Sequence, residues 1–146
     1  MLDKSKIGYQ SPPFIMEVEK GAIRKFADAI GDPNPLYRDE EKSHFGAIPA
    51  PPTFIQTLIQ EANASVRKAL DYDPKKLLHG EQSYVYYRPV LAGDVISCVA
   101  KIADIYEKEG KSGAMDFFVV ETTGTNQHGE IAFVARSVLV VRRNVK

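Results

Sequence analysis

Cysteine is nearly absent from this sequence, with Cys98 the only one among 146 residues. A lone cysteine excludes an internal disulfide and any multi-cysteine metal site, and we predict it to be a small buried hydrophobe in a reducing cytosol. An excess of either charge is also absent, since 19 Lys and Arg balance 19 Asp and Glu. Without a basic field to gather phosphates, nucleic-acid binding is not expected.

Long apolar runs are missing as well. No stretch approaches the ~20 apolar residues of a membrane span. The polar start over residues 1–6 leads to Gly, Gln, Ser and two prolines instead of the apolar stretch of a signal peptide. We therefore expect a cytoplasmic protein with no membrane partner. A Gly-rich phosphate loop, a Ser-His-Asp elbow and a metal-ligand cluster are also lacking, so no metal is expected.

The composition that remains is that of an ordinary globular protein. Hydrophobic residues make up 44% of the chain and charged residues 26%, which is enough apolar surface for a packed core. A length of 146 residues fits one domain. We predict a single domain over 1–146, with residues 1–12 as a flexible leader.

Helical spacing marks the first half of the chain. Between residues 19 and 30, apolar residues recur on one helical face: Ile23, Phe26, Ala27 and Ile30. Gly31 is placed to end this helix in a left-handed cap, and prolines 33 and 35 forbid its continuation. Residues 32–37 are therefore predicted to form a rigid loop.

A longer helix and then a sheet follow. The helix is predicted from residue 53 to about 70, with Thr53 in the N-cap position. After residue 74 the apolar period changes to 2, which indicates strands over 80–88, 94–107, 113–126 and 130–143. With a short edge strand at 14–16, these elements predict an α+β fold. A long central helix is wrapped by a curved antiparallel β-sheet, with an N-terminal helix-loop insertion.

Three segments carry a resemblance to a known family. The first is the helix end and loop Phe26-Ala27-Asp28-Ala29-Ile30-Gly31-Asp32-Pro33-Asn34-Pro35-Leu36-Tyr37. The others are Ala50-Pro51-Pro52-Thr53-Phe54 and Gly80-Glu81-Gln82-Ser83-Tyr84, the last continuing to Tyr87-Arg88-Pro89-Val90-Leu91-Ala92-Gly93-Asp94. Together they resemble the MaoC-like, FAS1-type dehydratase (R-specific enoyl-thioester hydratase) family of the hot-dog superfamily. In that family a Gly-Asp-x-Asn-Pro-Leu-His loop carries the catalytic Asp and His, so the resemblance implies a hot-dog fold.

The resemblance also implies a reaction and a site. The reaction is reversible hydration of a trans-2-enoyl thioester, carried on coenzyme A or acyl carrier protein, to a 3-hydroxyacyl thioester, with no further cofactor. A carboxylate and an imidazole hold one water, and each acid-base contribution is typically worth ~10²–10⁴ in rate. A backbone N–H at the start of the central helix stabilises the enolate oxygen. Asp32 takes the place of the catalytic carboxylate, and substrate-binding roles fall to Asn34, Pro52, Thr53 and Phe54.

Two positions depart from the family pattern. Tyr37 stands where the family has its histidine, and a phenol with an ordinary pKa of ~10 is a poor neutral-pH substitute for an imidazole near 6.5. Pro52 stands where active hydratases have a glycine whose N–H completes the oxyanion hole, and proline has no such donor. The N–H of Thr53, at the start of the central helix, is the alternative donor.

The remaining histidines leave several functions open. Tyr37, His44 and His79 are the candidate catalytic partners of Asp32 in a homodimeric hydratase. Alternatively, the chain is the acyl-binding half of a heterodimer whose other hot-dog subunit carries the intact Asp and His. A hot-dog thioesterase or a non-enzymatic acyl-CoA-binding protein is a further alternative, because the fold alone does not fix function. A dimer is expected in each case, because the sheet leaves an edge strand exposed.

Overall fold

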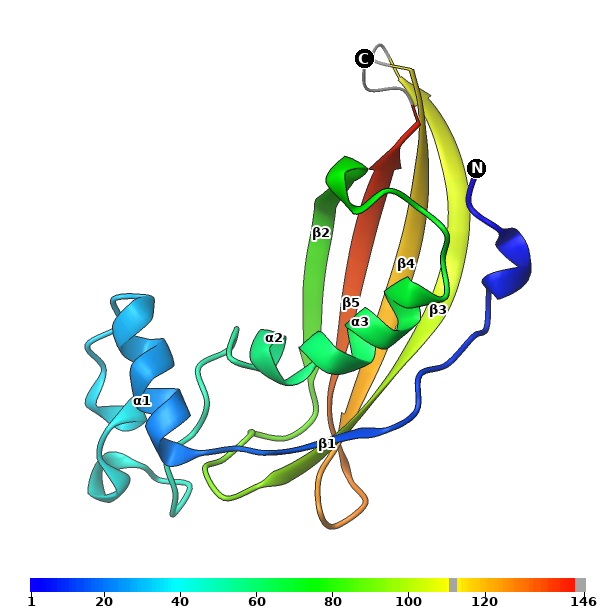
Figure 1. Cartoon of the computed structure of the whole chain (residues 1–146). Coiled ribbons are helices and arrows are strands. Elements are labelled where there is room, and N and C mark those ends of the chain that lie inside the picture. The colour runs from blue at the N-terminus through cyan, green and yellow to red at the C-terminus, as the bar shows by residue number, and fades with distance from the viewer. Residues whose placement is uncertain (111–112, 144–146) are drawn as a thin grey trace.

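The computed structural model describes residues 1–110 and 113–143. Over these residues, five strands form one curved antiparallel sheet in the order β1-β3-β4-β5-β2 (Figure 1). The strands are β1 Phe14–Glu17, β2 Leu77–Tyr86, β3 Val95–Gly110, β4 Gly113–Thr125 and β5 Ile131–Arg142. Each strand that period-2 alternation predicted is present within a few residues of its expected bounds. The predicted turn between β3 and β4 includes residues 111 and 112, which lie outside the described residues.

The sheet curves around one helical segment, while a second helix stands apart from it. The central segment comprises α2 (Ile55–Leu58) and α3 (Gln60–Lys68), and α1 is Lys20–Ala29. Figure 1 shows α1 beyond the free edge of β2, together with the short 3-10 turns η2 (Pro35–Tyr37) and η3 (Glu40–Lys42). We call residues 19–47 the lobe. The predicted helix-loop insertion is therefore present, and it lies beyond the β2 edge of the sheet.

The central helix differs from the prediction of one continuous element starting at an N-cap Thr53. It is broken at Ile59, and Phe54 precedes α2 without any side-chain cap. The hydroxyl of Thr57 donates to the carbonyl of Phe54, three residues earlier, at 2.7 Å. Hydrogen bonds of this kind compete with the helical ladder and bend helices. The apolar periodicity did not reveal the break because it continues across it.

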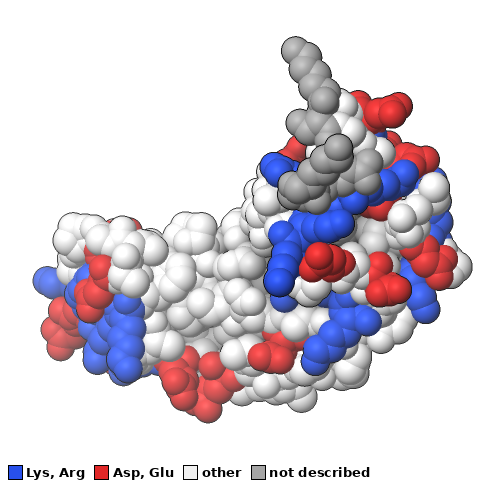
Figure 2. Space-filling model, turned by 45° about the horizontal axis from the view of Figure 1, so that its top comes forward, with Lys and Arg blue, Asp and Glu red and all other residues white. Residues whose placement is uncertain are grey.

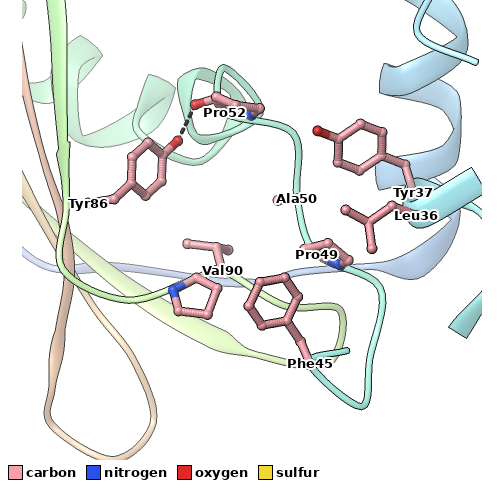
Figure 3. Close-up of a pocket in the computed structure, with 9 residues that line it drawn as sticks. Leu36, Tyr37, Phe45, Pro49, Ala50, Pro52, Tyr86 and Val90 are labelled. Carbon is pink, nitrogen blue, oxygen red and sulfur yellow. Dashed lines mark hydrogen bonds between the residues drawn. The ribbon is translucent and has the colours of Figure 1, made fainter. Parts of the chain in front are cut away.

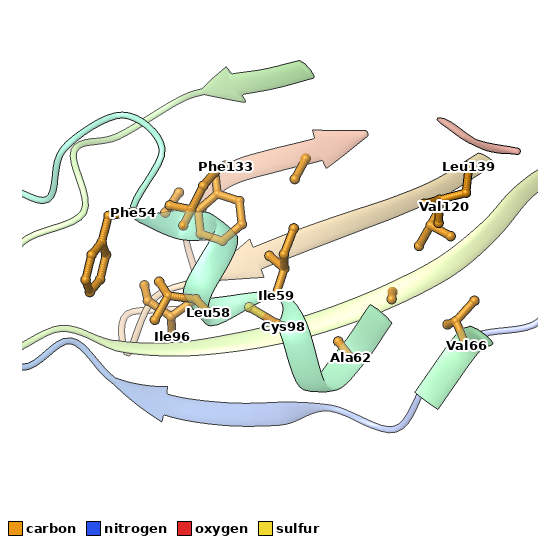
Figure 4. Close-up of a cluster of buried hydrophobic side chains, with 14 of the residues drawn as sticks. Phe54, Leu58, Ile59, Ala62, Val66, Ile96, Cys98, Val120, Phe133 and Leu139 are labelled. Atoms are coloured by element: carbon orange, nitrogen blue, oxygen red, sulfur yellow. The ribbon is translucent and has the colours of Figure 1, made fainter. Parts of the chain in front are cut away.

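The core lies between this helical segment and the concave face of the sheet (Figure 4). Its buried side chains include Leu58, Ile59, Ala62, Val66, Ile96, Cys98, Val120, Phe133 and Leu139. Each fully buried large aliphatic side chain contributes ~1.5–3 kcal/mol. Cys98 is fully buried, and burial raises the pKa of its thiol to about 12, so the prediction of a small hydrophobe is confirmed.

The first twelve residues do not form the flexible leader that we expected. They run along β3, where the N–H of Gly8 donates to the carbonyl of Ile102 at 2.8 Å and Ser11 bonds to Ala100. Leu2 joins the hydrophobic core with 4% of its surface exposed. The polar composition of the segment concealed this single apolar anchor. No helix in the described part of the chain is long and apolar enough to cross a membrane.

Candidate functional site

The loop after α1 is held in shape by its own side chains. Gly31 ends the helix with φ of 71°, the left-handed conformation that the sequence predicted. The Asp32 carboxylate accepts a hydrogen bond from the N–H of Asn34 at 2.9 Å. The side-chain oxygen of Asn34 accepts from the N–H of Leu36 at 3.0 Å and caps the turn that presents Tyr37.

Arg38 ties this loop back onto α1. Its guanidinium contacts the Asp28 carboxylate at 2.5 Å and donates to the carbonyl of Asn34 at 3.0 Å. Arg24 in turn donates to the carbonyl of Arg38 at 3.1 Å. The position of Tyr37 is therefore fixed from both sides, as the prediction of a rigid loop requires.

Tyr37 faces a cavity of about 270 Å³ between the lobe and the end of β2 (Figure 3). We call it the Tyr37 pocket. Its walls are apolar apart from two tyrosines, and the lining residues are Leu36, Tyr37, Phe45, Pro49, Ala50, Pro52, Tyr86, Pro89 and Val90. The rings of Tyr37 and Tyr86 lie on opposite sides of the cavity in Figure 3. Such a space suits an apolar group with a polar end.

The Tyr37 hydroxyl is a proton donor at neutral pH. Partial burial raises the pKa of Tyr37 above its ordinary value, and the negative charge of Asp32 raises it further. The hydroxyl therefore stays protonated well beyond neutral pH. It can donate a hydrogen bond into the pocket, but it cannot accept a proton from water.

Asp32 lies near Tyr37 but outside the pocket. Its carboxylate belongs to a shallow surface depression shared with Asp28, Gly31, Pro33 and Arg38. Asp32 acts on the Tyr37 phenol through its negative charge, which raises the pKa of Tyr37. The structure thus brings these two predicted site residues together, while only Tyr37 faces the cavity. Asn34, predicted to bind substrate, is exposed and uses its side-chain oxygen within the loop.

The two candidate histidines lie outside the pocket. His44 is exposed, and its ring packs on that of the lining residue Phe45 with centroids 4.0 Å apart. His79 is exposed on β2. It lies seven residues from Tyr86, roughly 23 Å at ~3.3 Å per residue. Within one chain, His79 does not reach Tyr37.

The start of the central helix is braced by β2. The Tyr86 hydroxyl donates to the carbonyl of Pro52, and the Tyr84 hydroxyl donates to the side chain of Gln56 at 2.9 Å. The N–H of Thr53 has no hydrogen-bond acceptor within residues 1–110 and 113–143, so it remains an available donor. Phe54 does not line the pocket: it is 3% exposed and packs edge-on against Phe26.

Tyr86 lines the pocket but was not among the predicted site residues. Alternation does place Tyr84 and Tyr86 on one face, but the pairing partner of β2 was unknown. The register with β5 places Tyr86 opposite Phe133, on the helix-covered face. The alternation therefore placed Tyr84 and Tyr86 on the same face of the strand. Only the order of the strands in the sheet shows that this face is the one covered by the helical segment.

The sheet, the central helical segment and the lobe loop define a hot-dog protein of the hydratase and dehydratase class. A family model described as FAS1-like, dehydratase domain region matches residues 5–135. The chain belongs to this FAS1-like dehydratase family, as its sequence motifs predicted.

Individual proteins and solved structures are also similar to this chain. A UPF0336 protein of Saccharopolyspora erythraea is 37% identical over 147 aligned positions, which cover 97% of this chain and 92% of the relative. A chain of the crystal structure of C-terminally truncated HadBC, a (3R)-hydroxyacyl-ACP dehydratase complex from Mycobacterium tuberculosis, is 26% identical with a TM-score of 0.82. That match covers 92% of this chain and 96% of the HadBC chain. The R-hydratase PhaJ1 of Pseudomonas aeruginosa shares the fold, with 19% identity, a TM-score of 0.71, and coverage of 94% and 83%.

Proposed function

We propose that this chain is the acyl-accommodating subunit of a heterodimeric hydratase or dehydratase acting on trans-2-enoyl thioesters of coenzyme A or acyl carrier protein. A second hot-dog subunit supplies the acid-base pair. The observation that carries the proposal is Tyr37, which stands where the family's histidine belongs and has a raised pKa. Adding water to an enoyl thioester requires a group that accepts and returns a proton near neutral pH. Tyr37 does not meet this requirement.

The rest of the pocket supports binding without catalysis. Its apolar walls accommodate the hydrocarbon part of an acyl thioester. The N–H of Thr53, which has no acceptor among the residues that the structure describes, lies at the start of the central segment, next to the lining residue Pro52. The loop is held in shape by the hydrogen bonds of Asp32 and Asn34, and the proposed loss is that of the imidazole alone. HadBC, a dehydratase complex, offers a precedent for the partner that the proposal requires.

The partner interface is assigned to the free edge of β2. Its outer side carries unpaired backbone groups over ten residues, and such an edge readily accepts another strand. Exposed apolar side chains flank it, with Leu78 at 42%, Val85 at 51% and Tyr87 at 63%. In Figure 2, the surface between the lobe and the rest of the molecule carries few charged side chains. Both features favour a strand-pairing partner.

Co-expression tests the proposal. The partner that the proposal requires is a short hot-dog protein with an intact Gly-Asp-x-Asn-Pro-x-His loop. We expect no hydration of crotonyl-CoA by the isolated chain, and hydration by the co-purified complex. If the isolated chain hydrates at a normal rate and Asp32→Asn abolishes it, the proposal is wrong. Release of free coenzyme A without hydration would instead indicate a thioesterase.

Restoring the imidazole tests the observation itself. In the isolated chain, Tyr37→His adds a group that titrates near neutral pH beside Asp32. We expect the hydration rate to rise ~10²-fold above that of the unmodified chain. Tyr37→Phe is the matched control, and it should leave the rate at the background level. If Tyr37→Phe lowers a measurable rate, tyrosine is itself catalytic.

A further inference from the structure

We infer that the turn between β4 and β5 positions one wall of the Tyr37 pocket, and that Gln127 is the positioning residue through which it acts. The turn, residues 126–130, lies at the bottom of Figure 1. Its residues, all within the described part of the chain, are not among those that line the pocket. The wall consists of residues 88–94, which we call the wall segment. The link from this wall to the acyl chain rests on the function proposed above.

The wall segment forms one side of the pocket together with the residues that lead into α2 (Figure 3). The lining residues that these two stretches contribute are Pro49, Ala50, Pro52, Pro89 and Val90. The N–H of Ala50 donates to the carbonyl of Val90 at 2.7 Å, and the N–H of Ala92 donates to the carbonyl of Ile48 at 2.8 Å. Because these bonds join the two stretches, a displacement of the wall segment displaces both.

The turn between β4 and β5 holds the wall segment at both ends. At the first end, the guanidinium of Arg88 forms an ion pair with the carboxylate of Glu130 at 2.8 Å. At the other end, the side-chain amide of Gln127 donates to the carboxylate of Asp94 at 2.9 Å. The side-chain oxygen of Gln127 also accepts from the N–H of Val95 at 3.1 Å. The lining residues of the wall segment therefore lie between two points that the turn fixes.

Asp94 transmits the position of Gln127 to the lining residues. One carboxylate oxygen of Asp94 accepts from Gln127, and the other accepts from the N–H of Leu91 at 2.8 Å. The N–H of Asp94 donates back to the carbonyl of Leu91 at 3.0 Å. Leu91 directly follows the lining residue Val90 in the chain. A shift of the Asp94 side chain therefore shifts the backbone of the wall.

The backbone of Asp94 also connects the wall segment to the lobe. Its carbonyl accepts from the N–H of Val18 at 2.8 Å, and the N–H of Gly93 donates to the carbonyl of Val18 at 2.8 Å. Gly93 has a φ of 93°, a conformation that side chains disfavour and that this turn requires. Val18 directly precedes the lobe, which brings Tyr37 to the pocket. The position of Asp94 thus affects two sides of the cavity.

The bonds of Gln127 set local geometry and add little to global stability. The residue is exposed, so water replaces its hydrogen bonds at small net cost. We expect the loss of these bonds to loosen the wall segment while the rest of the fold keeps its stability. This difference separates a positioning role from a general structural one.

Hydrogen exchange tests the positioning. The N–H groups of Ala50, Leu91 and Ala92 each donate one of the wall bonds. We expect Gln127→Ala to raise their exchange rates about tenfold, with the amides of β4 and the urea midpoint unchanged. Gln10→Ala, which changes an exposed glutamine beside β3, is the matched control and should behave as the unmodified chain. The full chain is labelled within the co-purified complex, or by itself where no complex forms.

An exchange of donor and acceptor provides the rescue. Gln127→Glu is isosteric and keeps the oxygen that accepts from Val95, but it sets a second carboxylate against Asp94. The wall should loosen as in Gln127→Ala. Adding Asp94→Asn restores the bond in the opposite direction, because the new amide donates to the glutamate while its oxygen accepts from Leu91. We expect this double variant to return the exchange rates to within about twofold of the unmodified chain.

Kinetics of the active complex test the link to the acyl chain. Crotonyl-CoA and trans-2-octenoyl-CoA are compared, because a longer chain contacts more of the wall. We expect Gln127→Ala to raise the KM for octenoyl-CoA about threefold, with a smaller rise for crotonyl-CoA and kcat unchanged for both. The double variant should restore the KM for octenoyl-CoA.

The outcomes separate this inference from the proposed function. If Gln127→Ala leaves the wall exchange rates unchanged, or the double variant does not restore them, the inference is wrong whether or not the heterodimer exists. Exchange rates that rise equally throughout the chain would overturn it in favour of a general stabilising role. A loosened wall with an unchanged KM for octenoyl-CoA would overturn the link to the acyl chain. If no active complex forms, the proposed function falls, and the exchange rates still decide whether Gln127 positions the wall.

Discussion

Side-chain hydrogen bonds hold α3 against the sheet and also hold the lobe loop in shape. The bond at α3 is buried in the core, whereas the bonds in the loop are exposed to solvent. In the core, the Thr122 hydroxyl donates to the side-chain oxygen of Asn63 at 2.6 Å, and both residues are buried. In the loop, the bonds of Asp32 and Asn34 are open to solvent. Water replaces an exposed hydrogen bond at little cost, whereas a buried group left unpaired costs ~1–3 kcal/mol. The core bonds therefore set stability, and the loop bonds set the geometry around Tyr37.

The largest expected effect on stability is in the core, at Gly124 on β4. A Cβ atom added there would lie 2.3 Å from the ring of Phe133, which covers the glycine from β5. We expect Gly124→Ala to lower the free energy of unfolding by about 3 kcal/mol, measured by urea titration. Gly21→Ala in α1 is the matched control, because no atom beyond its chain neighbours and the nearby helix backbone lies within 4 Å of its added Cβ. That variant should raise stability by up to ~1 kcal/mol.

A smaller effect, dependent on pH, is expected at Asp116. Burial alone would raise the pKa of this carboxyl, which is 3% exposed, but hydrogen bonds and charge from Arg143 outweigh burial and lower it. A lowered pKa contributes stability above the ordinary Asp value of ~3.9, and that stability is lost as pH falls through the folded-state pKa. Asp116→Asn should therefore destabilise the protein at pH 7 by less than Gly124→Ala. The difference in the free energy of unfolding between Asp116→Asn and the unmodified chain should shrink when the urea titration is repeated at lower pH. A difference that stays constant with pH would contradict this explanation.

The buried hydrogen bond itself is tested by a double-mutant cycle. Asn63→Leu alone leaves the Thr122 hydroxyl buried without its partner, and we expect a loss of about 1.5 kcal/mol. Adding Thr122→Val removes the unpaired group and should recover part of that loss. Thermal unfolding of the single and double variants measures the coupling. If the two losses in the free energy of unfolding are purely additive, the hydrogen bond between Asn63 and Thr122 contributes no coupling free energy.

The smallest effect on stability is expected in the loop. Asn34→Ala removes an exposed cap of the turn that presents Tyr37, and we expect a loss of only about 0.5 kcal/mol. Asn34→Asp keeps the accepting oxygen and should be nearly neutral. If Asn34→Ala destabilises the protein as much as Asn63→Leu, the contrast between core and loop is wrong.

The sequence predicted the fold well because period and burial are directly linked. Alternation along β3, β4 and β5 follows from one face of the sheet packing on the helices, so the strands were visible before their partners were known. The break at Ile59 was not visible, because it depends on a hydrogen bond from Thr57 to Phe54 and not on apolar spacing. The docking of residues 1–12 was missed because it depends on one buried leucine.

The candidate site was only partly predictable. The position of Tyr37 followed from the loop motif, since glycine and two prolines fix the local backbone. The cavity did not, because its walls come from three segments that only the fold brings together: the lobe, the residues leading into α2, and the end of β2. The same holds for His79, because its distance from the lobe depends on the fold and cannot be obtained from the sequence.

The open edge of β2 also has a consequence for how the chain is produced. Without a second strand beside it, the outer edge of β2 exposes unpaired backbone groups along a strand of ten residues, flanked by exposed aliphatic and aromatic side chains. Such an edge recruits other strands indiscriminately and leads to aggregation. In the heterodimer proposed above, balanced synthesis of the two subunits is then a condition of solubility. Surplus copies of this chain are expected to precipitate or to be degraded in proportion to the imbalance.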